Sequence, residues 1–296
     1  MSWRYLARAY LDLQHLRIAC EARIRRMREQ KVPENILEIM ENYSQALRRE
    51  ERRLLNEITM DLKDHPLWRW CSNVKGLGPV ACLTFLGFID PVKADTAGKA
   101  KAYLGLIPGA ELRSGRKAKM NPEGKGRIWL LTRNVIMNRD DYYYPLYQKK
   151  KQYYMETARK VFLNGEWITW PPFREILEDP SKCPRYQECV KRLVDKARRL
   201  RRKPKKPPCR AHLDAMAKRW LAGLLVSHAT EIMREALGLP TENFKAHHNY
   251  IRPKPIDEPV KIENHFIRSE PRKIENRLKK LAKGNREPLI RASHLR

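Results

Sequence analysis

The sequence has little of what membrane or secreted proteins need. No apolar run approaches the about 18 consecutive residues of a transmembrane helix, and no signal-peptide pattern precedes the first helical segment. The six cysteines are too sparse in 296 residues to make a disulfide scaffold. We therefore expect no membrane partner and a reducing, cytoplasmic compartment.

Acidic residues are scarce relative to basic ones. The chain carries 62 Lys and Arg against 34 Asp and Glu, a formal net charge of +28, and its pI is about 10.1. An excess of this size is typical of proteins that bind the phosphate backbone of nucleic acids. It favours DNA as the partner and a nucleoid-associated location, with a basic membrane-surface protein as the competing interpretation.

The alternating pattern of β-strands is absent from residues 1–66, where the pattern is helical. Pro33 separates a helix over about 2–30 from one over about 34–62. We predict an antiparallel helical hairpin or coiled coil over 1–65, which either extends the core or forms a homodimer. The apolar stripes behind this prediction are Leu6, Ala9, Leu13, Leu16, Cys20 and Met27, then Ile36, Ile39, Tyr43, Leu47, Leu54 and Ile58.

A helix-hairpin-helix is predicted over residues 66–90. Gly76 and Gly78 flank one apolar residue, which lets the backbone turn sharply, and Pro79 suits the first turn of the second helix. The free amides at such a helix start form an anion site that a DNA phosphate, with Lys75 beside it, would occupy. The alternative is an ordinary tight corner between two helices.

Between residues 110 and 125 the sequence becomes basic and loop-like. Five cations surround Ser114 and would repel one another without an anion between them, which a phosphodiester supplies. The same charge would stabilise the transition state if Ser114 attacked phosphorus, whereas the alternative role for Ser114 is that of a turn residue beside glycine. The five cations are Arg113, Arg116, Lys117, Lys119 and Lys125.

Taken in order, four short motifs resemble the C-terminal serine ("Transposase 20"-type) domain of bridge-RNA-guided insertion-sequence transposases. They are the helix-hairpin-helix, Gly105-Leu106-Ile107-Pro108, Ser114-Gly115-Arg116-Lys117, and Gly124-Lys125-Gly126-Arg127 before an apolar helix over about 128–138. The resemblance covers about 67–138, with a weaker one over 212–240. It implies that Ser114 is a recombination nucleophile and that a guide RNA takes part.

The chain departs from this family in two respects. The family commonly has two serines before the glycine, whereas this chain has Arg113-Ser114. The family also carries an N-terminal RuvC-like DEDD domain, for which residues 1–66 offer no strands. We therefore expect any strand exchange to need a partner protein that supplies the DEDD domain.

An inserted segment over about 160–210 interrupts the domain predicted for 66–250. Asn164-Gly165 between two apolar runs predicts a small β-hairpin. The following segment is expected to be loop-rich and to carry a basic arm from Lys191 to Lys206. Four residues of this region are candidate ligands of one structural zinc ion, or else three reduced thiols and a helix-start histidine: Cys183, Cys189, Cys209 and His212.

The last long helix is predicted from about His212 to Leu237, ending at Gly238. His228 on this helix is expected to be a core or edge histidine. A basic, Pro-rich extended tail is expected over 251–296. The fold class predicted from all these segments is mainly α.

These features predict a DNA-binding protein of the transposase type, with Ser114 cleaving a strand as the enzymatic version. Two alternatives remain: a repurposed binder without catalysis, and a structural subunit associated with RNA or a ribonucleoprotein. The predicted nucleic-acid contacts are Lys75, Gly76, Gly78, Arg113, Gly115, Arg116, Lys117, Lys119, Lys125 and Arg127.

Overall fold

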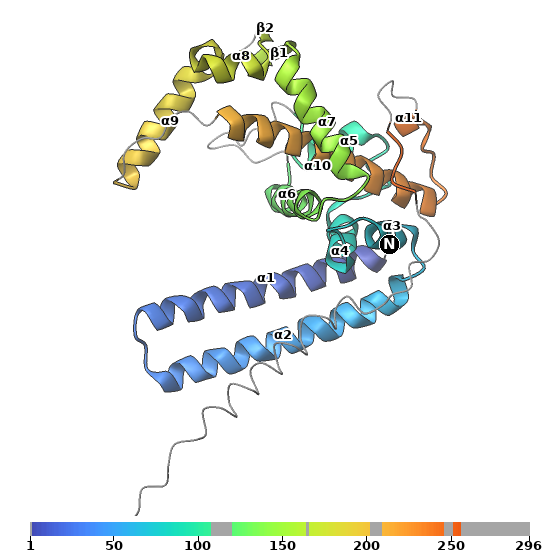
Figure 1. Cartoon of the computed structure of the whole chain (residues 1–296). Coiled ribbons are helices and arrows are strands. Elements are labelled where there is room, and N and C mark those ends of the chain that lie inside the picture. The colour runs from blue at the N-terminus through green and yellow to red at the C-terminus, as the bar shows by residue number, and fades with distance from the viewer. Residues whose placement is uncertain (1, 108–119, 164–165, 202–208, 246–250, 256–296) are drawn as a thin grey trace, which may run out of the picture. The chain divides into compact units, whose positions relative to one another are not determined.

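The computed structural model describes residues 2–107, 120–163, 166–201, 209–245 and 251–255. All of them belong to one compact unit, Met1–Ile256. The described chain is mainly helical with one small antiparallel sheet, as predicted (Figure 1). The predicted tail over 251–296 is wrong for residues 251–255, which pack on the fold with Lys254 buried. The rest of that tail, the residues around Ser114 and the turn at 164–165 lie outside the described residues.

The structure describes the following elements in chain order. They are α1 (Ser2–Glu29), α2 (Glu34–Leu62), α3 (Pro66–Asn73), α4 (Pro79–Phe88), α5 (Ala97–Tyr103), α6 (Pro122–Met137), α7 (Tyr143–Glu156), β1 (Arg159–Leu163), β2 (Glu166–Trp170), α8 (Phe173–Glu178), the 3₁₀ helix η1 (Pro180–Lys182), α9 (Tyr186–Arg199), α10 (Cys209–Ala236) and α11 (Glu242–Lys245). Of the described helices, none combines the length and apolar character that a membrane span requires.

Helices α1 and α2 form the predicted antiparallel hairpin and lie side by side (Figure 1). The predicted stripe of α1 is right in part: Cys20 is buried and Leu13 packs beside it, whereas Leu6 and Leu16 are 40% and 41% exposed. The reason is that α1 packs on α4 as well as on α2, which turns a different face inward. The residues that α1 buries are Ala7, Tyr10, Leu11, Cys20 and Ile24.

A buried carboxylate ties the two helices of the hairpin together. Glu51 of α2 accepts hydrogen bonds from the Tyr10 hydroxyl and the Gln14 amide, both at 3.2 Å, and pairs with Arg17. Burying a charge costs free energy unless it is paired and hydrogen-bonded, and here it is both. Because these partners sit at fixed positions on α1, Glu51 helps to set the register of the hairpin.

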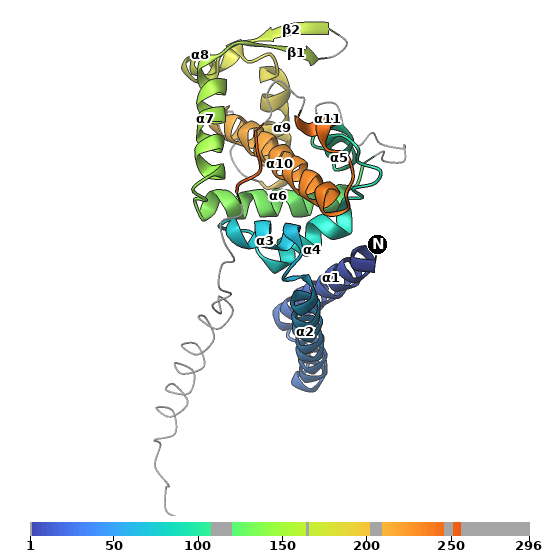
Figure 2. The same cartoon turned by 90° about the vertical axis from the view of Figure 1, so that its right-hand side faces the viewer.

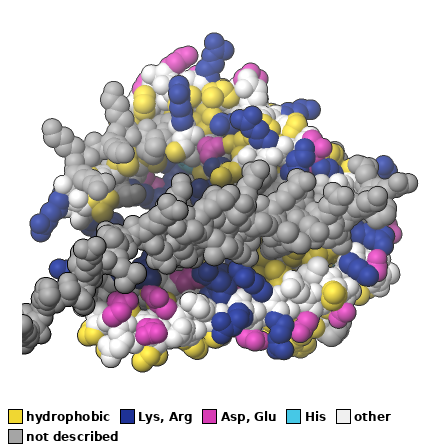
Figure 3. Space-filling model, turned by 60° about the horizontal axis from the view of Figure 1, so that its bottom comes forward, with side chains coloured by type: hydrophobic (Ala, Val, Ile, Leu, Met, Phe, Trp, Pro, Cys, Tyr) yellow, Lys and Arg dark blue, Asp and Glu magenta, His cyan; other side chains and the backbone are white. Residues whose placement is uncertain are grey.

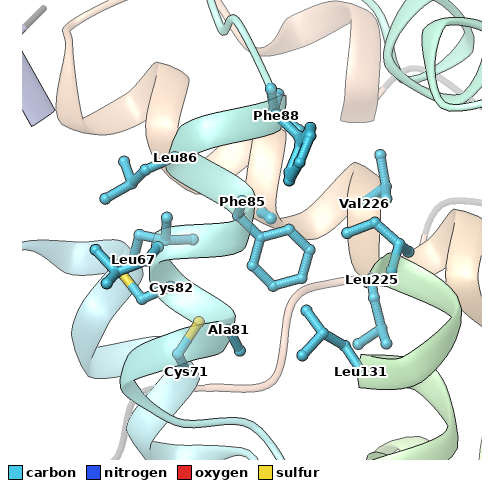
Figure 4. Close-up of a cluster of buried hydrophobic side chains, with 14 of the residues drawn as sticks. Leu67, Cys71, Ala81, Cys82, Phe85, Leu86, Phe88, Leu131, Leu225 and Val226 are labelled. Carbon is cyan, nitrogen blue, oxygen red and sulfur yellow. The ribbon is translucent and has the colours of Figure 1, made fainter. Parts of the chain in front are cut away.

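Helix α4 is the centre of the core and is apolar on every side. It packs against α1, α3, α6 and α10, and Phe85 points towards Leu131 of α6 and Leu225 of α10 (Figure 4). The Trp70 ring of α3 lies 5.7 Å from the Phe85 ring. A helix buried all round gives no amphipathic period, so only its caps mark it in the sequence.

Helix α6 begins six residues earlier than the sequence pattern predicted. The Asn121 side chain accepts a hydrogen bond from the Gly124 N–H at 2.9 Å, and Pro122 occupies the first helical turn. Asn121 is therefore an ordinary N-cap with proline in the first turn, and the helix continues through Gly124 and Gly126. Lys125 and Arg127 therefore lie on a helix and not in a loop.

Helix α10 runs between α7 on one side and α5 and α11 on the other (Figure 2). It contacts α3, α5, α6, α7 and α8. Gly238, with φ of +64°, follows its end at Ala236. The predicted helix and its stop are confirmed, within three residues at the start.

The predicted β-hairpin pairs β1 with β2 antiparallel, with Val161 opposite Ile168. The segment after it is more helical than predicted, since α9 covers Tyr186–Arg199. Trp170, Phe173 and Leu213 are buried in a second apolar cluster, which joins this segment to the start of α10.

Candidate nucleic-acid interface

The hairpin corner between α3 and α4 is held by glycine at position 76. Gly76 has φ of +94°, which L side chains rarely adopt. A Cβ atom there would lie 2.5 Å from the Asn134 carbonyl oxygen of α6. The turn closes with a 3.0 Å hydrogen bond from the Leu77 N–H to the Val74 carbonyl. Gly76 is thus required by the close contact of the corner with α6.

Gly78 has a different role from Gly76. It is the N-cap of α4 and its backbone is extended, so its conformation does not demand glycine. A Cβ atom at this position would meet no heavy atom within 4 Å. Among the described residues, the N–H groups of Gly78 and Val80 donate no hydrogen bond, and both residues are partly exposed. These free amides at a helix start form an open anion site.

Three cations lie close to this corner in the chain or in space. Lys75 is exposed, and its backbone N–H is fixed by the Asp140 carboxylate at 2.8 Å. Arg133 and Arg139 directly precede Asn134 and Asp140, the two residues that contact the corner. Both arginines are exposed, and neither forms an ion pair with a described carboxylate. Neither arginine stands out in the sequence, because the contacts of Asn134 and Asp140 with the corner arise only from packing.

Asp140 fixes the corner to the start of α7 although its side chain is fully buried. Its carboxylate accepts hydrogen bonds from the backbone N–H groups of Lys75, Tyr142 and Tyr143 at 2.8 to 3.0 Å. The ammonium group of Lys254 completes the set at 3.1 Å and is itself buried. One carboxylate therefore orients the corner, α7 and the segment at 251–255.

A buried polar chain lies behind the corner. The Trp70 indole N–H donates to the Tyr143 hydroxyl oxygen at 3.2 Å. The Tyr143 hydroxyl pairs with His228 Nδ1 at 2.8 Å, and His228 Nε2 pairs with the Ile251 carbonyl at 2.7 Å. Because a carbonyl only accepts, Nε2 carries the proton and the Tyr143 hydroxyl donates to Nδ1. His228 is the core histidine that the sequence favoured, and burial lowers its pKa to about 4.

Acidification is expected to destabilise the fold through His228. The unfolded histidine has a pKa of 6.5 and the folded one about 4, so between these values only the unfolded chain binds the proton. The free energy of unfolding should therefore fall as pH drops through 6.5, by about 3 kcal/mol near pH 4. Urea titrations at several pH values measure it, with His228→Gln as the variant that lacks this slope. An unchanged slope in the variant would contradict the assignment.

Two predicted contacts on α6 are engaged within the protein. The guanidinium group of Arg127 donates to the Gln14 side chain at 2.8 Å and to the Leu11 carbonyl at 3.2 Å, and it pairs with Glu123. Arg127 therefore joins α6 to α1. Lys125 is partly buried, and its stem lies close to Gly105.

The other predicted contacts lie outside the described residues. The structure places no part of the segment at 108–119, which holds the predicted nucleophile Ser114. The same segment holds Arg113, Gly115, Arg116, Lys117 and Lys119.

Two of the four predicted zinc ligands, Cys183 and His212, lie at the second apolar cluster. Cys183 is buried there, and the His212 ring lies edge-on to the rings of Trp170 and Phe173 at 5.7 and 5.8 Å. Burial lowers the pKa of His212 and raises that of Cys183. In the part of the chain with described side chains, which omits that of Cys209, no three His, Cys, Asp or Glu residues are placed to hold a metal ion.

On the face that Figure 3 shows, basic side chains are interspersed with acidic ones. The candidate interface is therefore defined by the open helix start at the corner and by the exposed Lys75 beside it, rather than by charge alone. Comparisons of the chain with protein-family models, with curated proteins and with solved structures find no match.

Proposed function

We propose that this protein binds DNA by gripping the phosphate backbone at the α3–α4 corner. The observation that carries the proposal is the open start of α4, where Gly78 and Val80 present free N–H groups beside exposed Lys75. Backbone amides and a helix dipole bind phosphate without reading the base sequence. The net charge of +28 adds long-range attraction to a polyanion.

Duplex affinity is expected to fall steeply with salt. If the corner amides and cations neutralise three phosphates, log K should fall with log salt with a slope of about −2.7, a loss of about 40-fold between 50 and 200 mM. Fluorescence anisotropy with a labelled duplex at four salt concentrations measures this slope. A flat dependence, or no binding at 50 mM salt, would contradict the proposal.

The family resemblance supports a transposase-type role, with a guide RNA and a DEDD-domain protein as further partners. Strand cleavage by Ser114 is the enzymatic version of this proposal, and a ribonucleoprotein subunit without catalysis is the alternative. Trapping of a covalent protein–DNA adduct by the wild type and not by Ser114→Ala would support cleavage. The absence of any adduct, with both partners supplied, would leave a binding protein.

The N-terminal hairpin supports a homodimer within this proposal. Ile36, Ile39 and Tyr43 lie three or four residues apart on α2 and are 44% to 67% exposed. Sedimentation of wild type and Ile39→Glu tests the dimer, which the variant should dissociate. A monomeric wild type would end it.

A structural zinc ion is the second addition to the proposal. It rests on the ligand chemistry of Cys183, Cys189, Cys209 and His212, of which Cys183 and His212 both lie at the second apolar cluster. Elemental analysis of protein purified without chelator tests it, and a content well below about one zinc per chain would remove it.

A further inference from the structure

A groove of about 1000 Å³ lies away from the corner, between α5, α7, α10 and α11. Helix α10 lines it with Arg219, Trp220 and Gly223, and the aliphatic part of the Lys101 side chain packs beside Gly223. His228 and Ile251 also line it, so the buried polar chain supports one wall. The groove is therefore built on the rigid centre of the fold.

The charge of the groove is positive. Lys101, Lys149 and Arg219 line it, and none of them forms an ion pair with a carboxylate of the described chain. The single acidic residue among the described lining residues is Glu231, which interacts with Lys245 of α11. Unpaired cations on the walls of a groove attract an anionic ligand.

Aromatic rings line the same groove. The ammonium group of Lys150 lies 4.2 Å from the Tyr153 ring centroid, 5.0 Å from that of Tyr154 and 5.6 Å from that of Trp220. Cation–π contacts of this kind hold the three rings in place. Tyr153 stays 45% exposed and Trp220 is partly exposed, so flat apolar surface faces the groove.

We propose that this groove binds an unpaired segment of nucleic acid. Cations and exposed rings in one groove fit a chain that carries phosphates on one side and free bases on the other. A double helix offers no free base faces, so the rings would gain nothing from it. The inference rests on the proposed nucleic-acid function and adds a second site, for single strands, to the duplex contact at the α3–α4 corner.

The test measures binding of a labelled 15-nucleotide oligothymidylate and oligouridylate to the full chain. Lys149→Glu combined with Arg219→Glu should weaken binding at least about tenfold, because both cations are exposed and face the ligand. Tyr153→Ala should weaken it about fivefold or more, because the base loses its stacking partner. The control Lys63→Glu, an exposed cation at the end of α2, should change little.

An abasic oligonucleotide of the same length separates stacking from charge. It should bind more weakly than oligothymidylate, and Tyr153→Ala should remove that difference. Equal binding of both oligonucleotides, or oligothymidylate binding that ignores all three groove substitutions, would overturn the groove site. Duplex binding without oligothymidylate binding would overturn the groove alone, whereas loss of both in the wild type would end the proposed function as well.

Discussion

Replacement of Gly78 by aspartate is expected to weaken duplex DNA binding strongly while leaving the fold intact. A side chain at this position meets no protein atom within 4 Å, so it points into the space where a phosphate would approach. Aspartate is also a favoured N-cap, which satisfies the free N–H groups of α4 that phosphate would otherwise use. The same substitution thus raises helix stability and repels the ligand.

The expected size of this effect follows from the strength of one phosphate hydrogen bond. A hydrogen bond to a charged group contributes about 1.5–3 kcal/mol, so its removal should weaken binding about 10- to 100-fold. Gly78→Asn is the matched control, because it has the same shape and capping ability without the charge, and should weaken binding less. Anisotropy titration gives the affinity and thermal denaturation gives the stability. Duplex affinity of Gly78→Asp equal to that of the wild type would exclude the corner as the phosphate site.

Replacement of Gly76 by alanine is expected to destabilise the protein, whereas replacement of Gly78 by aspartate is expected to leave the fold intact. Its φ of +94° strains any L residue, and the new Cβ atom would lie 2.5 Å from the Asn134 carbonyl oxygen. That oxygen belongs to the backbone of α6, which cannot move without disturbing its packing in the core. Backbone strain of about 1–2 kcal/mol and overpacking of about 1–3 kcal/mol together give a loss of about 2–5 kcal/mol.

Urea denaturation measures this loss, and Gly126→Ala is the matched control. Gly126 lies within α6 with no atom within 4 Å of its Cβ position, so alanine there should stabilise the helix by about 0.5–1 kcal/mol. Equal stability of Gly76→Ala and the wild type would mean that the corner is not pressed against α6 as described.

Proline and glycine residues that start or stop helices located most elements in the sequence, because their effect on the backbone is confined to a few residues. Pro33 and Pro79 marked the breaks and starts around α2 and α4, and Gly238 marked the stop after α10. The start of α6 was missed although Asn121 and Pro122 signalled it, since Gly124 and Gly126 were interpreted as loop residues. In the structure Gly124 lies in the first turn of α6. A Cβ atom there would lie 2.7 Å from Leu104, so glycine permits this close packing.

The apolar stripe of α1 shows that sequence periodicity does not by itself determine which face of a helix is buried. An apolar period identifies a helix but leaves open which of two overlapping faces is buried, and contact with α4 selected the face of Ala7 and Leu11. Similarly, Arg127 looked like a phosphate ligand, but α1 offers it the Gln14 and Leu11 oxygens. No local signal distinguishes a cation that binds protein from one that faces solvent.

The sequence by itself determined the helical class, the hairpin corner, the β-hairpin and the strong positive charge, because periodicity, turn residues and composition are local or additive properties. Tertiary structure alone decided which groups act together. It separated Gly76, pressed against α6, from Gly78, open to solvent, and it placed Asp140 under the corner. It also brought α5, α7 and α10 together into a basic, aromatic groove. These juxtapositions join residues far apart in the chain, and burial of apolar surface, rather than any local preference, sets them.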